Sequence, residues 1–428
     1  MKLLIKGGKV LDPINNIDDV MDVLITDGKI TTVQKNINDN EAEIIDATDK
    51  IVCPGFIDLH VHFREPGLEY KEDITSGSEA AAVGGFTTVC CMPNTNPAID
   101  NGSVAVYIKD RADKTGLVNV FPIGSITKGQ EGKELSPIAE LISAGCVAIS
   151  EDGHTVASSK IMRNALEYSK MFDLPVMCHC EDKQLSREGQ MHEGYFSTIY
   201  GLTGIPAEAE DVIVARDIML SRLTGAKVHF CHVSTKGAVE LISQAKEEGL
   251  NVTCEVTPHH LILSDEIVGD YDTDTKVSPP LRSQEHIEAL IEGIKDGTID
   301  CIATDHAPHH FEGKDCEYDL ADFGISGLET AIAVIMDKLV DNNIITITKM
   351  VELMAVEPAS ILGIDKGTLN EGNLADITII DPELTKDVDT NNFYSKGKNT
   401  PFKGSTLKGW PIMTIVNGRI VAHDGVVI

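Results

Sequence analysis

The sequence predicts an α/β protein: a (β/α)8 TIM barrel with a composite β-sandwich domain built from both chain termini. Three observations lead to this fold. Eight short apolar runs alternate with longer helical patterns, histidines and carboxylates follow the ends of several runs, and both ends of the chain carry short strands with turns. A chain of 428 residues is long enough for such a barrel and one additional domain.

The eight apolar runs are the expected barrel strands. They lie at residues 56–60, 88–92, 118–123, 146–150, 175–179, 227–232, 252–256 and 299–304. Helical periodicity between them predicts helices over residues 74–83, 104–114, 158–171, 207–223, 236–246 and 284–295. Because strand and helix alternate along the chain, parallel strands closed into a barrel are the expected arrangement.

The two ends of the chain have a different character. Short alternating strands with glycine-containing turns occupy residues 1–52 and 367–428. Neither end alone offers enough strands for a stable sheet, so we expect both ends to combine into one β-sandwich domain. The barrel domain is then expected to span residues 53–366.

Composition excludes several classes of partner. The formal net charge of −31 argues against nucleic-acid binding, which depends on Lys and Arg neutralising phosphates. No apolar stretch approaches the roughly 20 residues that a membrane span requires. The ten cysteines lie mostly within apolar runs, and the N-terminus carries no signal-peptide pattern, so reduced thiols and a cytoplasmic location are expected.

The strand ends hold the main candidates for function, because enzymes with this fold build their sites there. His60 and His62 lie two positions apart, so period-two alternation directs both imidazoles toward one point. An isolated His-x-His pair is usually two surface histidines. Further polar groups at later strand ends change this interpretation; they are Asn94, Glu151, Asp152, His179, His232, His259, His260 and Asp305.

Three cysteines beside these histidines suggest thiolate ligands at first sight. Cys178 and Cys180 flank His179, and Cys231 precedes His232. Alternation along a strand turns a neighbouring side chain to the opposite face, here toward the surrounding helices. These thiols are therefore predicted to be packing residues.

Imidazole and carboxylate ligands without thiolate are typical of a catalytic zinc site or a related divalent-ion site. The six candidate ligands are His60, His62, Asp152, His179, His232 and Asp305. They exceed the needs of one tetrahedral ion and favour two ions with a bridging carboxylate, about 3.5–4 Å apart. Asp305 could bind one ion and keep an oxygen free to take and return a proton.

Six motifs resemble those of the dihydroorotases, members of the amidohydrolase superfamily, in their long bacterial type. The motifs are HVHFREPG at 60–67, MPNT at 92–95, HCE at 179–181, HVST at 232–235, EVTPHH at 255–260 and ATDHAPH at 303–309. Their order and spacing and the length of the chain agree with that family. No role for His259 or His260 follows from the motif, and structural histidines near the mouth are the expectation.

The resemblance implies the reversible cyclisation of N-carbamoyl-L-aspartate to (S)-dihydroorotate in de novo pyrimidine (UMP) synthesis. In the hydrolytic direction a metal-bound hydroxide attacks the ring carbonyl, and Asp305 acts as general base and then general acid. Zn²⁺ is the expected ion, at two per chain, although imidazole and carboxylate also accept cobalt or manganese.

The resemblance also implies a set of substrate contacts. Arg64 is expected to bind the substrate carboxylate together with Asn94, because a planar guanidinium suits bidentate recognition. His309 and the Phe323–Gly324 backbone are further expected contacts. The alternatives are a rim arginine, a turn asparagine and an exposed loop histidine. Ser278 departs from the family, which commonly has Asn or Arg there, and this change puts affinity in doubt.

Residues 308–324, between the last strand and its helix, are expected to form a loop that closes over the substrate. The alternative is a solvated connection that is equally ordered with and without ligand.

Three other functions compete with this one. A hydantoinase, dihydropyrimidinase or allantoinase would share the barrel and metals, but those enzymes commonly carry a carboxylated lysine after strand four. Residues 146–153 contain no lysine, and Asp152 takes its place. A catalytically inactive scaffold for aspartate carbamoyltransferase would lack metal ligands, and a metal-storage protein would not need Arg64 and Asn94. A small-molecule substrate, a homodimer and possible association with aspartate carbamoyltransferase are what the resemblance implies about partners.

Overall fold

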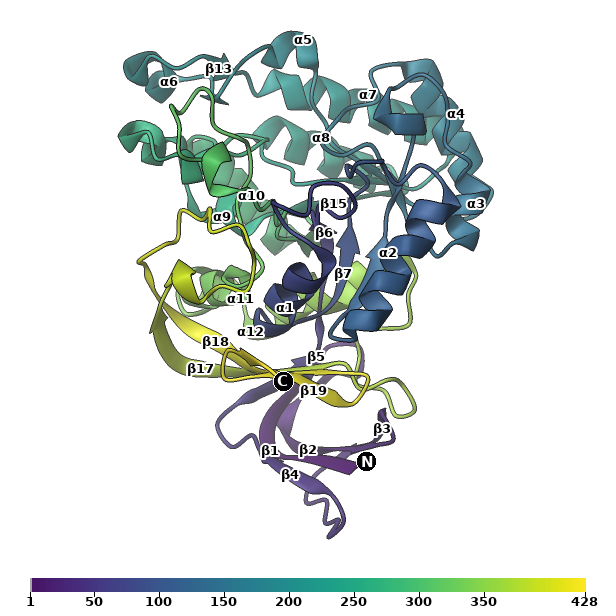
Figure 1. Cartoon of the computed structure of the whole chain (residues 1–428), viewed down its shortest axis with the longest axis vertical. Helices are drawn as coiled ribbons and strands as arrows, with labels where there is room; N and C mark the ends of the chain where they lie inside the picture. The colour runs from purple at the N-terminus through teal and green to yellow at the C-terminus, as the bar shows by residue number, and fades with distance from the viewer. Residues whose placement is uncertain (1) are drawn as a thin grey trace.

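The computed structural model describes residues 2–428 and contains the predicted barrel (Figure 1). Nine short strands form its wall: β6 (Phe56–Val61), β7 (Phe86–Cys91), β8 (Asn119–Pro122), β9 (Gly124–Ser125), β10 (Ile149–Ser150), β11 (Val176–Cys178), β14 (Val228–Phe230), β15 (Val252–Val256) and β16 (Cys301–Ile302). Neighbouring strands pair in parallel, in the orders β6-β7-β8 and β9-β10-β11-β14-β15-β16. All eight predicted strands are present; β8 lies within the third predicted run, and β9 follows just beyond its end.

The barrel closes between its first and last strands. Val61 at the end of β6 forms a parallel bridge with His306, four residues after β16. The backbone N–H of His62 donates to the His306 carbonyl at 2.8 Å. The ends of β6 and β16 are thus held side by side, which brings the 60–65 and 305–309 segments to the same mouth.

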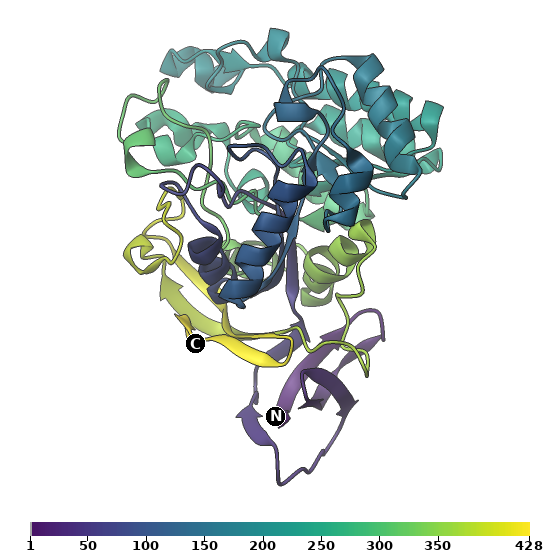
Figure 2. The same cartoon turned by 45° about the vertical axis from the view of Figure 1, so that its right-hand side comes forward.

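Helices surround this wall (Figures 1 and 2). They are α1 (Ile74–Val83), α2 (Gly102–Thr115), α3 (Ile138–Ser143), α4 (Ser159–Lys170), α5 (Lys183–Ser186), α6 (Tyr195–Tyr200), α7 (Glu208–Thr224), α8 (Lys236–Glu247), α9 (Pro258–Ile262), α10 (Gln284–Asp296), α11 (Ala331–Ile335), α12 (Ile347–Val351) and α13 (Glu357–Leu362). All six predicted helices are among them. Local sequence defines several starts; Asp73, for example, caps α1 by accepting a hydrogen bond from the Ser76 N–H at 2.8 Å.

Cysteine packing divides into two cases. Cys178 and Cys180 lie in the apolar layer between strands and helices, together with Val214 of α7, as predicted. Cys231 is also a packing residue, in an apolar cluster with Leu59 and Met177, but its predicted direction is wrong, because its sulfur lies within 4.8 Å of ligand atoms of His60 and Glu255. Alternation continued from β14 directs Cys231 to the same face as His229, whose Nε2 lies 3.1 Å from Glu255, and it is His232, with a φ of 35°, that departs from the alternation. The Cys231 thiol therefore faces the barrel interior.

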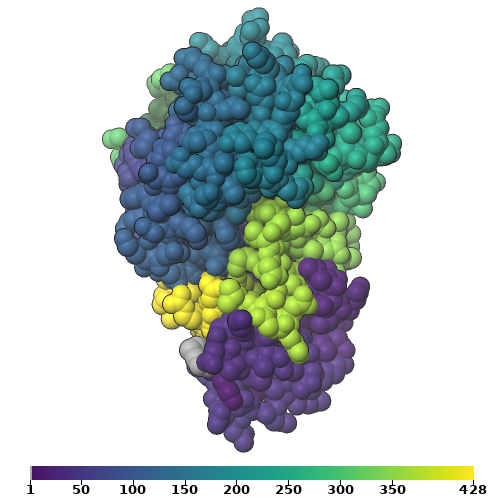
Figure 3. Space-filling view, turned by 90° about the vertical axis from the view of Figure 1, so that its right-hand side faces the viewer, coloured from purple at the N-terminus to yellow at the C-terminus, as the bar shows by residue number. Residues whose placement is uncertain are grey.

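Strands from both chain ends form one further sheet below the barrel (Figure 1). In the space-filling view, residues of the N-terminus (purple) and of the C-terminus (yellow) lie together at this end of the molecule (Figure 3). It contains β1 (Lys2–Asp12), β2 (Ile17–Thr26), β3 (Lys29–Gln34), β4 (Glu43–Asp46), β5 (Ile51–Pro54), β17 (Ile377–Asp387), β18 (Thr406–Val416), β19 (Arg419–His423) and β20 (Val426–Val427). The antiparallel pairing of β5 with β17 joins the N-terminal strands to the C-terminal ones. A separate apolar core includes Leu3, Val23 and Ile377. The composite terminal domain is thus present, while its boundaries at 52/53 and 366/367 stay a prediction.

None of the helices in the described part of the chain is long and apolar enough to cross a membrane.

Candidate active site

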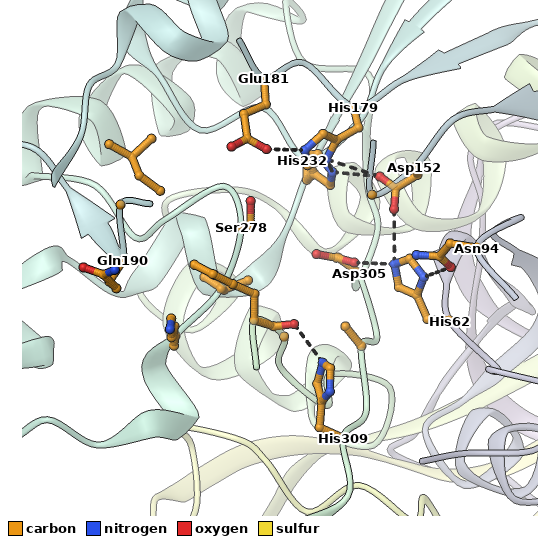
Figure 4. Close-up of a pocket in the computed structure, with 18 of the residues that line it drawn as sticks. His62, Asn94, Asp152, His179, Glu181, Gln190, His232, Ser278, Asp305 and His309 are labelled. Atoms are coloured by element: carbon orange, nitrogen blue, oxygen red, sulfur yellow. Dashed lines mark hydrogen bonds and ion pairs between the residues drawn. The ribbon is translucent and has the colours of Figure 1, made fainter. Parts of the chain in front are cut away.

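The predicted site residues converge at the mouth of the barrel (Figure 4). A cavity of about 580 Å³ opens there, a size suited to a small ligand. Its lining includes His62, Arg64, Asn94, Asp152, His179, His232, Ser278, Asp305, His309, Phe323 and Gly324. His60 lies beneath this lining and is fully buried. The site has two groups of residues: the His/Asp cluster (His60, His62, Asp152, His179, His232, Asp305) and a second group, named the substrate rim for the contacts that the resemblance implies (Arg64, Asn94, Ser278, His309, Phe323, Gly324).

Asp152 occupies the centre of the His/Asp cluster. Its Oδ2 lies 3.4 Å from Nε2 of both His60 and His62. Its Oδ1 lies 3.2 Å from His232 Nε2 and 3.4 Å from His179 Nδ1. One carboxylate therefore faces two histidine pairs, one pair with each oxygen.

His60 is oriented by a carboxylate on its other side. Its Nδ1 donates to Glu255 Oε1 at 2.6 Å, and His229 Nε2 is 3.1 Å from Glu255 Oε2. A hydrogen bond at Nδ1 leaves the Nε2 lone pair directed at the cluster, as in metal-bound histidines with outer carboxylate partners. Glu255 thus sets the orientation of His60 from below.

His62 and His179 are held in the same manner. His62 Nδ1 hydrogen-bonds to Asn94 Oδ1 at 2.9 Å, and its Nε2 lies 3.1 Å from Asp305 Oδ1. His179 Nε2 hydrogen-bonds to Glu181 Oε2 at 3.1 Å, while its Nδ1 is 3.0 Å from His232 Nε2. Asn94 is therefore a partner of a cluster histidine as well as a cavity-lining residue.

The cluster keeps its carboxylates ionised. Burial opposes the charge on Asp152 and Asp305, but the neighbouring His60 imidazole and further histidines hold the pKa of both carboxyl groups below the usual value. Two buried anions surrounded by imidazoles form an environment that stabilises positive charge.

The donor set fits a divalent metal. His60, His62 and Asp305 offer ligand atoms within 4.8 Å of one another, and so do His60, Asp152 and His232. His60 Nε2, which faces Asp152, is buried without a hydrogen-bond partner among residues 2–428. Unpartnered buried nitrogens are costly in the absence of a ligand, and imidazole with carboxylate suits zinc and its neighbours.

Arg64 is the cation of the substrate rim. Its side chain is buried and donates from Nε to the Pro308 carbonyl at 3.4 Å. Within residues 2–428 no carboxylate forms an ion pair with its guanidinium within 4.0 Å. A buried guanidinium that lines a cavity without a counter-ion is suited to bind an anionic ligand.

The loop after β16 supplies the other side of the rim. His309 Nε2 donates to the Phe323 carbonyl at 2.8 Å, and its Nδ1 faces Asp322 at 2.8 Å and Lys71 at 3.2 Å. Gly324 adopts a φ of 151°, and a Cβ there would lie 2.8 Å from His309 Nε2. Glycine is therefore needed at 324 for this approach. Whether the loop closes over a ligand stays a prediction.

The structure accounts for the remaining strand-end groups. Ser278 lines the cavity and is partly exposed. His260 hydrogen-bonds to Thr257 Oγ1 at 2.7 Å and to the Pro279 carbonyl at 2.9 Å, which is a structural role. His259 is buried, and its Nε2 has no hydrogen-bond partner in the described chain.

Sequence reasoning missed Glu255 and Glu181 as partners of His60 and His179. A signal for Glu255 existed, because it is a carboxylate inside an otherwise apolar strand. It also missed Lys276, whose ammonium lies 4.5 Å from the centre of the Phe323 ring at the cavity edge.

Comparison with known proteins identifies the family. A family model described as "Dihydro-orotase-like" matches residues 49–238. The dihydroorotase of Pelotomaculum thermopropionicum is 55% identical over 427 residues, covering 100% of both chains. That of Acetivibrio thermocellus is 52% identical over 426 residues, again covering 100% of both. The chain belongs to the dihydroorotase family.

Structural comparison places this dihydroorotase-family chain among cyclic amidohydrolases. The L-hydantoinase (dihydropyrimidinase) from Arthrobacter aurescens superposes with a TM-score of 0.90 at 28% identity, covering 100% of this chain and 97% of that one. The dihydropyrimidinase of Brevibacillus agri shares the fold, with a TM-score of 0.87 at 24% identity and coverage of 100% and 96%. The predicted TIM-barrel fold is thereby confirmed.

Proposed function

We propose that this protein is a dihydroorotase, which interconverts N-carbamoyl-L-aspartate and (S)-dihydroorotate in pyrimidine synthesis. The observation that carries the proposal is the position of Arg64, an unpaired buried cation in the same cavity as the His/Asp cluster. Dihydroorotate joins an anionic carboxylate to a cyclic amide, so it needs both parts of the cavity. Two relatives that match over their full length, at 55% and 52% identity, are named dihydroorotase.

The proposed cofactor is a pair of Zn²⁺ ions. His60 and His62 would hold one ion, His179 and His232 the other, with Asp152 shared between them and Asp305 completing the first. Ions bound there supply Lewis acidity toward the ring carbonyl and lower the pKa of the attacking water. Each oxygen of Asp152 faces one of the two histidine pairs, which supports this distribution of ligands between the two ions. No carboxylated lysine is expected.

The substrate rim would orient the ring. Arg64 would bind the carboxylate through its guanidinium, with Asn94 donating from its amide. His309 and the Phe323–Gly324 backbone would contact the ring amide, and Ser278 would add a hydroxyl. Held in this way, the reacting carbonyl lies over the His/Asp cluster rather than in bulk water.

Asp305 would move the proton. In ring opening its carboxylate accepts a proton from the attacking water and delivers it to the departing ring nitrogen; ring closure reverses both transfers. The ionised state of Asp305 favours its start as a base, and the contact of Oδ1 with His62 Nε2 at 3.1 Å fixes its orientation.

Hydantoinase or dihydropyrimidinase activity is the second candidate, because the hydantoinase fold superposes over the whole chain. Hydantoin and dihydrouracil, the rings that these two activities open, are neutral and lack the carboxylate that Arg64 would bind. A scaffold-only role for aspartate carbamoyltransferase is disfavoured by the complete His/Asp cluster.

The test measures metal per chain and ring opening of dihydroorotate, hydantoin and dihydrouracil for the wild type and Asp305→Ala. We expect turnover of dihydroorotate alone and a loss of about a hundredfold or more in the variant. Preference for a neutral ring, or full activity of Asp305→Ala, would contradict the proposal.

Location and assembly are further proposals. Ten free cysteines, nine of them buried, suit a reducing compartment such as the cytoplasm. A homodimer and association with aspartate carbamoyltransferase follow from the family resemblance. Light scattering of the chain alone and mixed with that enzyme tests both.

A further inference from the structure

Residues 394–400 leave the terminal sheet and reach the mouth of the barrel. They belong to the connection between β17 and β18, which rises toward the barrel beside α11 (Figures 1 and 2). This connection contacts the loop that carries His309 and Gly324.

The contact centres on the side chain of Asn399, which is 3% exposed. Its Nδ2 donates to the carbonyl of Ala307 at 3.1 Å and to that of Gly324 at 2.9 Å. Its Oδ1 accepts from the His309 N–H at 3.0 Å and lies 3.1 Å from Ser326 Oγ, whose single proton it shares with the Gly397 carbonyl at 3.0 Å. A carboxamide has two N–H donors and two acceptor lone pairs, so all four have a partner on this loop.

These four partners lie on both arms of the loop. Ala307 and His309 belong to the arm that leaves β16, whereas Gly324 and Ser326 belong to the returning arm. The arms also pair directly, since the Ala307 N–H donates to the Ile325 carbonyl at 2.9 Å. Asn399 therefore sets the separation of the two arms at the point where His309 and Gly324 enter the cavity.

Residues 394–400 also contact the loop that follows β6, the first strand of the barrel. Ser395 Oγ donates to Glu72 Oε2 at 2.5 Å, and the Lys396 N–H donates to Glu72 Oε1 at 3.2 Å. Gly397 packs so closely on Pro308 that a Cβ would lie 2.5 Å from its ring. Pro308 in turn accepts the hydrogen bond from Arg64 Nε. A displaced segment would thus disturb both sides of the substrate rim.

We infer that Asn399 is a positioning residue for substrate binding, acting through His309 and Gly324. The inference rests on the proposed dihydroorotase function. It makes the C-terminal segment part of the active site, although Asn399 does not line the cavity. Because Asn399 contacts no member of the His/Asp cluster, its loss should affect KM more than kcat.

Asn399→Asp is the main test, since it keeps the shape of the side chain and replaces two donors by an oxygen facing two carbonyls. We expect KM for dihydroorotate to rise about tenfold or more, as for lost buried hydrogen bonds, with kcat and metal content near wild type. Asn392→Asp is the matched control, because Asn392 is exposed in the same connection and its side chain hydrogen-bonds to Asp389, away from the loop that carries His309. The control should leave KM unchanged.

Two further variants keep the test decisive. Ser326→Ala removes the hydroxyl that is shared by Asn399 Oδ1 and the Gly397 carbonyl, and it decides the question if Asn399→Asp does not fold. Its KM should rise about twofold or more. In an Asn399→Asp/His309→Ala double variant, the KM effects should be less than additive, because one residue acts through the other.

Each failure has its own signature. An unchanged KM in the folded variants, or a fall in kcat and thermal stability alone, overturns the positioning role. Absence of dihydroorotate turnover in the wild type would instead overturn the proposed function.

Discussion

The His/Asp cluster and the substrate rim share one cavity but are built differently. In the cluster, the carboxylate oxygens of Asp152 and Asp305 lie 3.1–3.5 Å from histidine nitrogens, and the buried His60 Nε2 lacks a hydrogen-bond partner in the described chain. In the rim, Arg64 has no anionic partner, and His309 and Gly324 are held by a loop and by Asn399. The cluster is thus suited to cations and the rim to an anionic ring. Substitutions in the two groups should therefore give different kinetic signatures.

The largest effect is expected for Asp152→Asn. The neutral amide removes the charge that faces both histidine pairs, so bound metal and kcat/KM should fall together. The loss should reach about a hundredfold or more, because outer partners of metal ligands alone account for 10- to 100-fold effects. Metal analysis of the purified protein and steady-state kinetics measure it. Wild-type metal content with wild-type turnover would remove Asp152 from the site.

Arg64→Lys should show the opposite signature. An ammonium cannot reproduce bidentate binding of a carboxylate, so KM for dihydroorotate should rise by about ten- to hundredfold with metal content unchanged. Arg163→Lys on exposed α4 is the matched control, since Arg163 pairs only with Glu167. If Arg64→Lys lowered metal content instead, the separation between cluster and rim would be wrong.

The His309 imidazole should make the stability of the folded protein depend on pH. Burial lowers the pKa of its imidazole to about 4, despite Asp322 beside it, against about 6.5 in the unfolded chain. Its contribution to stability is therefore present above pH 6.5 and is lost as the pH falls toward 4, by about 2 kcal/mol between pH 7 and pH 5. Urea unfolding at several pH values should show a shallower acid loss for His309→Gln than for wild type. Parallel losses in both proteins would contradict this account.

The smallest effect is expected for Ser278→Asn. The longer amide adds a hydrogen-bond donor at a cavity-lining position. KM should therefore fall by about two- to tenfold, which is the effect expected from one additional neutral hydrogen bond. Steady-state kinetics with both substrates measure it. A higher KM would indicate that the amide crowds the ring and that serine suits this cavity.

Much of the fold and of the candidate site follows from local sequence. Apolar runs and helical periodicity placed all eight strands and six helices, because both repeats are short. The same alternation brought His60 and His62 to one point. It gave the wrong face for Cys231, because His232, beyond the end of β14 and with a φ of 35°, departs from the alternation. Glu255 lies 195 residues from His60, and Asn399 lies 90 residues from His309, so no local pattern predicts their contacts.

By itself, the sequence determined the barrel, the composite terminal domain and the residue types at each strand end. These depend on side-chain periodicity and on motifs only a few residues long. Only the tertiary structure decided which oxygen of Asp152 faces which histidine pair, that Glu255 orients His60, and that a C-terminal asparagine holds the substrate loop. Such contacts join residues far apart in the chain, and barrel closure and domain packing bring them together.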